Sequence, residues 1–377
     1  MRKGKPGARV TRFTVVFVGL LANAQPRMPL NVRVVAAPAS QKLTTIAWTK
    51  QPKTAGWPGF TGYTTLQSDP VGLTVLFYGI LGASSSIYSS NVFAYTTSTN
   101  SYQNLVGTNQ LMTFCNPNTA TIPGDRHPVG QMAVDTQRNR LWLYGGVCGG
   151  VNRNDLWYLT LHADPSQNTW VNVTPQCPGN CPERPNTNDS AMVYNSDRDV
   201  LFLWGDHNSS GFPRAWVYHI DTGRWEDVTP ATNPPGLSFP GLVYDTLTRK
   251  AIQFGGGSAG GIYYNQTWAF DFATKTWRRK ALATGPTIAP LNTPLPQAAL
   301  DPVKHRIFLH IPALVPEDWM YDIALDLWLV LVTTGGGPAC NLSNTMALDR
   351  RTGNTLVAHC RDILTFDFET WRGLITN

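Results

Sequence analysis

The residues of this 377-residue chain that could do chemistry are arginines, histidines and carboxylates that stand beside apolar runs: Arg126, His127, Glu183, Arg184, Asp206, His207, His310, His359 and Arg361. Arginine forms paired hydrogen bonds with carboxylates and similar oxyanions, while histidine and carboxylates exchange protons. If a fold gathers these side chains at one end, they form a mixed-charge ring that suits a sugar or carboxylate ligand.

Each of these residues also has a purely structural interpretation. Arg126-His127 and Glu183-Arg184 precede apolar strands, where solvated pairs are common, and His310 and His359 end strands and would bond neighbouring loops. The sequence contains no serine elbow, phosphate loop or HExxH motif. It therefore predicts no complete catalytic set, no cofactor and no metal site.

A repeated hairpin supplies the elements that would position these residues. Two short apolar runs flank a polar turn in six copies, at residues 63–79, 132–146, 192–206, 242–256, 298–312 and 346–360. Alternating or continuous apolar runs of this length predict paired β-strands. An aspartate recurs where the turn begins, and we expect it to bond the backbone of its own turn. These aspartates are Asp135, Asp245, Asp301 and Asp349.

A second signature follows each hairpin and predicts a third and a fourth strand. It occupies residues 91–105, 155–173, 215–228, 267–282, 318–331 and 362–375. An aromatic residue opens each predicted fourth strand, and we expect it to pack in the core or between sheets. These residues are Tyr102, Trp170, Trp225, Trp277, Trp328 and Trp371.

The repeat resembles the kelch repeat. Three copies carry the glycine after the second strand and the tryptophan on the fourth: Tyr144-Gly145-Gly146 with Trp170, Trp204-Gly205 with Trp225, and Phe254-Gly255-Gly256 with Trp277. The other copies have Tyr78-Gly79, His310-Ile311 and His359-Cys360 instead. The resemblance covers residues 59–377 and implies an all-β, six-bladed propeller of four-stranded antiparallel blades, like the central domain of galactose oxidase.

The residues before the repeat divide into two segments. Residues 1–24 have a basic start, an apolar core at 13–21 and the small residues Ala22 and Ala24, which is typical of a secretory signal peptide. Residues 25–58 form a leader in which 43–50 resembles a tryptophan-led outer strand. We expect this strand to close the ring by packing against or replacing the last predicted strand, which carries Trp371.

Export would place six cysteines in an oxidising compartment, either outside the cell or in a periplasm. In antiparallel hairpins the start of one strand lies beside the end of the next. This placement favours the pairs Cys115–Cys148 and Cys340–Cys360, with Cys177–Cys181 closing a small loop; a zinc site at this last pair beside His207 is the alternative. Glycosylation sequons begin at Asn172, Asn188, Asn208, Asn265 and Asn341.

The resemblance implies two enzyme classes that can be weighed against the residues. The chain is similar to exported six-bladed sialic-acid epimerases (mutarotases) in length, blade number and signal, but no catalytic motif of that group matches. Galactose oxidase-like copper enzymes need a Cys–Tyr cross-link and further histidines. Here every cysteine has a structural partner, and Tyr218-His219 lies in a predicted third strand.

Charge and composition limit the function further. The net charge is +6, but the basic residues are dispersed after the first segment, so we expect no nucleic-acid binding. No segment of the mature chain is apolar enough to span a membrane. We expect an exported binding or interaction module for a glycan or an extracellular protein. A carbohydrate-active enzyme and a structural subunit of an extracellular assembly are the alternatives, and the oligomeric state stays open.

Overall fold

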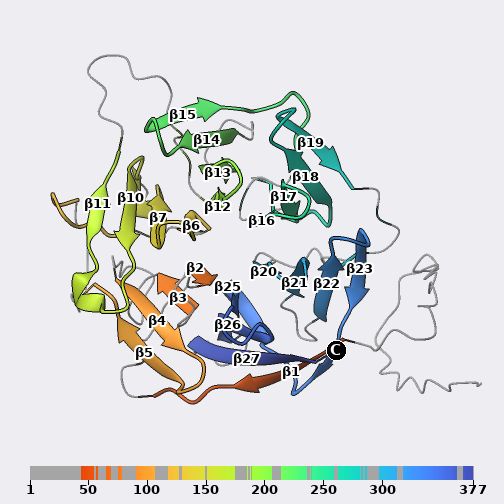
Figure 1. The fold of residues 1–377 in the computed structure, drawn as a ribbon. Helices are drawn as coiled ribbons and strands as arrows, with labels where there is room; N and C mark the ends of the chain where they lie inside the picture. The colour runs from red at the N-terminus through yellow and green to blue at the C-terminus, as the bar shows by residue number, and fades with distance from the viewer. Residues whose placement is uncertain are drawn as a thin grey trace, which may run out of the picture. The chain divides into compact units, whose positions relative to one another are not determined.

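The computed structural model is an all-β propeller (Figure 1). It describes residues 44–54, 57, 65–68, 75–78, 91–106, 118–126, 130–148, 151–174, 185, 187, 189–205, 214–235, 238, 240–258, 262–280, 282, 285–286, 297–311, 317–362 and 368–376. Of residues 75–78, 297, 340–344 and 360–361 it describes only the backbone. The predicted signal and most of the predicted leader, residues 1–43, lie outside this set.

Five antiparallel sheets of four strands form blades, and in each the strands pair in chain order. The first blade contains β2 (Thr65–Ser68), β3 (Val75–Tyr78), β4 (Val92–Thr96) and β5 (Ser101–Asn104). The second contains β6 (Met132–Asp135), β7 (Arg140–Tyr144), β10 (Leu156–Thr160) and β11 (Trp170–Asn172). The third contains β12 (Ala191–Asn195), β13 (Val200–Trp204), β14 (Ala215–His219) and β15 (Arg224–Asp227).

The fourth blade contains β16 (Gly241–Asp245), β17 (Lys250–Phe254), β18 (Thr267–Asp271) and β19 (Thr276–Arg279). The fifth contains β20 (Gln297–Asp301), β21 (Arg306–Ile311), β22 (Glu317–Asp322) and β23 (Leu327–Val330). A small sheet pairs β8 (Val147–Cys148) with β9 (Val151–Asn152), and a 3-10 helix, η1 (Pro165–Gln167), precedes β11. No described helix is long and apolar enough to cross a membrane.

A further sheet has five strands and joins the two ends of the described chain. Its order is β24 (Val332–Thr334), β1 (Thr45–Lys50), β27 (Phe368–Thr376), β26 (Thr355–Asp362) and β25 (Cys340–Asp349). The expected strand at 43–50 is therefore confirmed as β1, and its Thr45 is opposite Thr376 while its Lys50 is opposite Trp371. The placement of Trp371 on a fourth strand was wrong, because β27 pairs directly with β26 and is the third strand.

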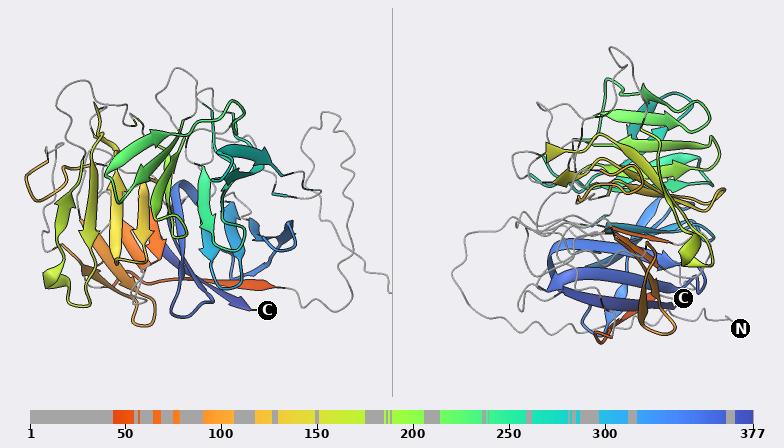
Figure 2. Two further views of the ribbon diagram at one scale, coloured as in Figure 1. Left: turned by 45° about the horizontal axis from the view of Figure 1, so that its top comes forward. Right: turned by 90° about the vertical axis from the view of Figure 1, so that its left-hand side faces the viewer.

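The first strand of each four-stranded blade, and β25 of the five-stranded sheet, lie nearest the centre of the ring (Figure 1). β2, β6, β12, β16, β20 and β25 contact one another in cyclic order. The same strands line a central cavity of about 150 Å³, and most of its lining residues are aliphatic, such as Val134, Leu242 and Leu348. Seen from the side, the described turns lie at the ends of the strands (Figure 2).

The repeated turn residues do what the sequence predicts. Asp135 is fully buried and accepts hydrogen bonds from the backbone of Gln137 at 2.9 Å and Arg138 at 3.1 Å. Asp245, Asp301 and Asp349 accept equivalent backbone bonds. These bonds satisfy backbone N–H groups that water cannot reach inside a tight turn. Each aspartate therefore stabilises its own hairpin turn.

The glycine after the second strand and the repeated tryptophans are also structural. Gly145 has φ +60° and a Cβ there would approach Arg153 O to 3.0 Å, so a side chain would be both strained and crowded. Trp170, Trp277 and Trp328 are buried in the clusters between neighbouring sheets, which confirms their packing role.

Candidate functional site

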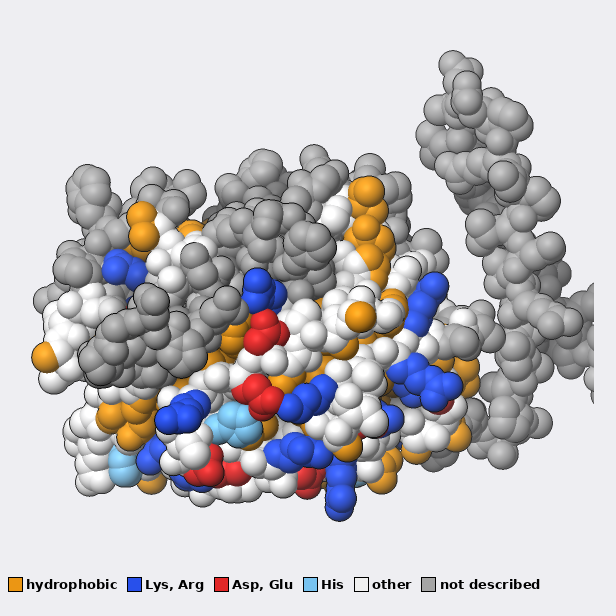
Figure 3. Space-filling model, turned by 90° about the horizontal axis from the view of Figure 1, so that it is seen from above, with side chains coloured by type: hydrophobic (Ala, Val, Ile, Leu, Met, Phe, Trp, Pro, Cys, Tyr) orange, Lys and Arg blue, Asp and Glu red, His pale blue; other side chains and the backbone are white. Residues whose placement is uncertain are grey.

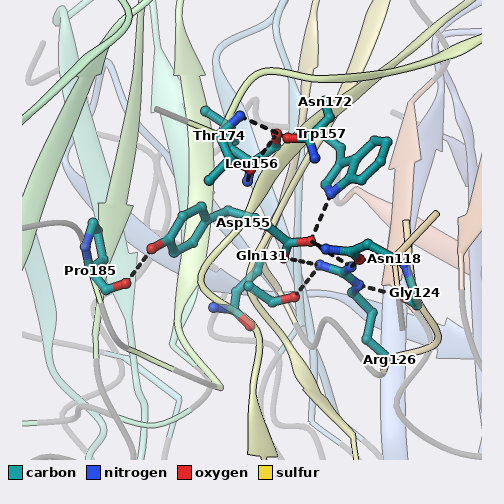
Figure 4. A network of polar contacts seen from close by, with 12 residues as sticks. Asn118, Gly124, Arg126, Gln131, Asp155, Leu156, Trp157, Asn172, Thr174 and Pro185 are labelled. Carbon is teal, nitrogen blue, oxygen red and sulfur yellow. Dashed lines mark hydrogen bonds and ion pairs between the residues drawn. The ribbon is translucent and has the colours of Figure 1, made fainter. Parts of the chain in front are cut away.

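Arg126 lies within the second blade and is fully buried (Figure 4). Its Nη1 and Nη2 donate to the two carboxylate oxygens of Asp155, at 2.5 and 2.9 Å. They also donate to Gly145 O at 3.0 Å and Asn118 Oδ1 at 2.9 Å, and Nε donates to Gly124 O at 2.9 Å. All five N–H donors of a guanidinium are thereby used, so Arg126 ties a loop to the sheet and has no donor left for a ligand.

Asp155 is the centre of this network. It precedes β10 and also accepts hydrogen bonds from Trp157 Nε1 and Asn118 Nδ2, both at 2.7 Å. Burial alone would raise the pKa of Asp155, but the hydrogen bonds and charge of Arg126 outweigh it and the pKa lies below its ordinary value. The pair is therefore ionised and fixes the loop that enters the blade.

His310 lies on β21 of the fifth blade, opposite Gln297 of β20. It is fully buried, and its Nδ1 lies 2.9 Å from Asp318 Oδ1 while its Nε2 lies 2.8 Å from Pro338 O. The other oxygen of Asp318 accepts bonds from Trp48 Nε1 and Thr333 Oγ1, both at 2.8 Å. Through Asp318, His310 is linked to β1 and β24, and both of its ring nitrogens have partners within the protein.

His359 is buried in the five-stranded sheet. Its Nδ1 lies 3.2 Å from Thr370 Oγ1, and its ring stacks on Phe368 with ring centroids 6.1 Å apart. Burial, with a smaller contribution from the charge of Lys53, lowers its pKa to about 3. The ring is neutral at physiological pH and packs at the position that Tyr144 and Trp204 occupy in other sheets.

A recurring side-chain hydrogen bond, which was not predicted from the sequence, orients several tryptophan rings. A carboxylate or amide two residues earlier accepts a bond from the indole Nε1, because residues i and i+2 share one face of a strand. The pairs are Asp155 with Trp157, Gln266 with Trp268, Glu317 with Trp319 and Glu369 with Trp371, at 2.7 to 3.0 Å. The spacing is visible in the sequence and could have identified Asp155 as structural.

The other candidates lie outside the described side chains. His127, Glu183, Arg184, Asp206 and His207 fall in gaps of the described chain, and for Arg361 only the backbone is described. The gap that contains Glu183 and Arg184 precedes β12, and the gap that contains Asp206 and His207 follows β13, which pairs with β12 in an antiparallel manner. The expected ligand-binding ring at these residues stays a prediction.

The predicted disulfides and sequons are only partly within the described chain. Cys148 is almost fully buried and is disulfide-bonded, but its predicted partner Cys115 lies outside the described residues. The side chains of the other four cysteines also lie outside them. Asn172 and Asn265 are exposed, whereas Asn188, Asn208 and the side chain of Asn341 are not described.

The described residues contain no group of three or more metal-ligating side chains. A comparison of the chain with models of known protein families finds no match. The fold and the chemistry of individual residues therefore carry the functional argument.

Proposed function

We propose that the chain is a kelch-like six-bladed propeller in which the five-stranded sheet is the sixth blade. The cyclic contacts of the first strands support this count. β1 would supply the outer strand that the C-terminal repeat lacks, so that the two ends of the chain close the ring in one sheet.

The proposed setting is outside the cytoplasm. Residues 1–24 act as a cleaved signal, and the disulfide at Cys148 suits an oxidising compartment. Cys115–Cys148, Cys177–Cys181 and Cys340–Cys360 are the proposed pairs. Peptide mass mapping of the exported protein without reduction tests the signal cleavage and the cysteine pairing. A mature chain that starts before Gln25 would contradict the first, and other cysteine pairs would contradict the second.

The proposed function is that of a binding module for a glycan or an extracellular protein. One observation supports this proposal. The buried ionisable residues Arg126, His310 and His359 hold the scaffold together and do not face a cavity. A rigid scaffold of this kind is suited to present connecting segments to a ligand. Those segments contain Glu183, Arg184, Asp206 and His207.

Glycan-array binding of the purified protein and its Arg184→Ala variant tests this proposal. Arg278→Ala is the matched control, because Arg278 is exposed on the outer strand β19. We expect wild type and control to bind the same glycans and Arg184→Ala to lose most of the signal. Equal binding by all three forms would exclude Arg184 from the site, and binding by none would leave protein partners as the ligand class.

A further inference from the structure

A groove of about 240 Å³ lies between the third and fourth blades. Val217 and Val228 of the third blade and Phe272 of the fourth form part of its floor. These three residues belong to the core cluster between the two blades, so the groove is where that core meets solvent. On the side of the ring that carries β15 and β19, cationic, acidic and histidine side chains lie among exposed hydrophobic ones (Figure 3).

A set of ionisable side chains surrounds this floor: Arg198, His219, Glu226 and Lys275. Lys275 of the fourth blade donates to Glu226 Oε1 of the third, and His219 Nε2 lies 3.0 Å from Glu226 Oε2. The hydrogen bond from Lys275, followed by the one from His219, lowers the pKa of Glu226. Glu226 is therefore an ionised acceptor that fixes both neighbours.

Two groups of this set keep unused bonding capacity. Arg198 is exposed and has no ion-pair partner among the described residues. Because the ionised Glu226 can only accept, His219 donates to it through Nε2. No described residue bonds Nδ1. The groove thus offers a guanidinium, an ammonium and a second imidazole nitrogen beside an apolar floor.

The charged set is an exception to the repeat. Glu226 is opposite Val217 in its blade, and the equivalent pairs in the fourth and fifth blades are Arg278 with Ala269 and Leu329 with Met320. Lys275 has φ +52°, a left-handed conformation that is unfavourable for lysine. The equivalent turn positions hold residues that adopt it more easily: Asn100, Gly223 and Asp326.

We propose that this groove binds a hexuronate, the acidic sugar unit of an acidic glycan. The inference rests on the proposed glycan-binding function. The sugar carboxylate pairs with Arg198 and Lys275, a ring hydroxyl forms a hydrogen bond with His219 Nδ1, and the C–H face of the sugar covers Val217 and Phe272. The volume is smaller than that of a pocket for a drug-sized ligand, which suits one sugar unit rather than an oligosaccharide.

Calorimetric titration of the exported protein with D-galacturonate, and separately with D-galactose, tests the assignment. We expect galacturonate to bind saturably with a millimolar dissociation constant and galactose to bind at least about tenfold more weakly, since only the former has the carboxylate. Arg198→Gln and Lys275→Asn should each weaken galacturonate binding about tenfold. Asparagine tolerates the left-handed turn, so Lys275→Asn removes the charge without backbone strain.

Arg249→Asn is the matched control, because Arg249 is also an exposed cation with positive φ, at +56°, but does not line the groove. It should bind galacturonate like the wild type, and all variants should keep the wild-type melting temperature. Absent binding, equal binding of the two sugars, or undiminished binding by Lys275→Asn and Arg198→Gln would overturn the assignment. If these two variants bind array glycans normally while Arg184→Ala does not, the groove assignment fails and the proposed function stands. If no form binds any glycan, the groove assignment fails together with the glycan part of the proposed function.

Discussion

At the scale of single residues, the buried pair of Arg126 and Asp155 should matter most to stability. Asp155→Asn would leave the Arg126 charge buried without its counter-ion, which typically costs about 3–5 kcal/mol. The control is Asp227→Asn, because Asp227 forms a 2.9 Å ion pair with Arg214 in which both side chains are partly exposed. Such a pair contributes at most about 1 kcal/mol. Urea denaturation of both variants measures the difference, and similar losses would refute the structural role of Arg126.

His359 should make the protein less stable in acid. Its pKa is about 3 in the folded protein, against an ordinary value near 6.5 in the unfolded chain. Between these values the unfolded state binds a proton that the folded state does not, so stability falls as pH drops through this window, by up to about tenfold in the unfolding constant per pH unit.

The His359→Phe variant tests this effect, because Phe254 fills the equivalent position in the fourth blade. Unfolding free energies at pH 7.5 and pH 5 should differ less for His359→Phe than for the wild type. His162→Gln changes an exposed histidine and should keep the wild-type difference. An unchanged pH dependence in His359→Phe would mean that the buried ring does not titrate as described.

At the scale of elements, the segment after β24 controls how closely β1 can approach. Gly335 and Gly336 both have φ +80°, but a Cβ on Gly335 would lie 2.1 Å from Trp48 O, whereas one on Gly336 would contact nothing within 4 Å. Gly336→Ala should cost only the left-handed strain, about 1–2 kcal/mol. Gly335→Ala adds a clash with the β1 backbone and should cost clearly more in thermal unfolding. Equal costs would show that β1 does not lie against Gly335.

The strands also show which features of the fold can be predicted from the sequence. Alternating apolar runs identify the hairpins because strand pairing across a short turn is local. The placement of Trp371 failed because its strand resembles the tryptophan-led outer strands, while its true position depends on pairing with residues 45–50 at the other end of the chain. Arg126 looked like a ligand-binding residue because its partner Asp155 is 29 residues away.

At the scale of the whole molecule, β1 should decide whether the proposed six-bladed ring stays closed. Ile46 is fully buried and Trp48 nearly so, and both belong to the core cluster that spans the fifth blade and the five-stranded sheet. Because β1 is hydrogen-bonded to β27, removal of β1 would expose both this core and the edge of β27. An exposed strand edge promotes pairing with other chains. A chain that begins at Leu43 should therefore melt cooperatively as a monomer, whereas one that begins at Gln51 should melt at a lower temperature and aggregate. Calorimetry with light scattering measures both, and equal behaviour of the two truncated chains would mean that the ring closes without β1.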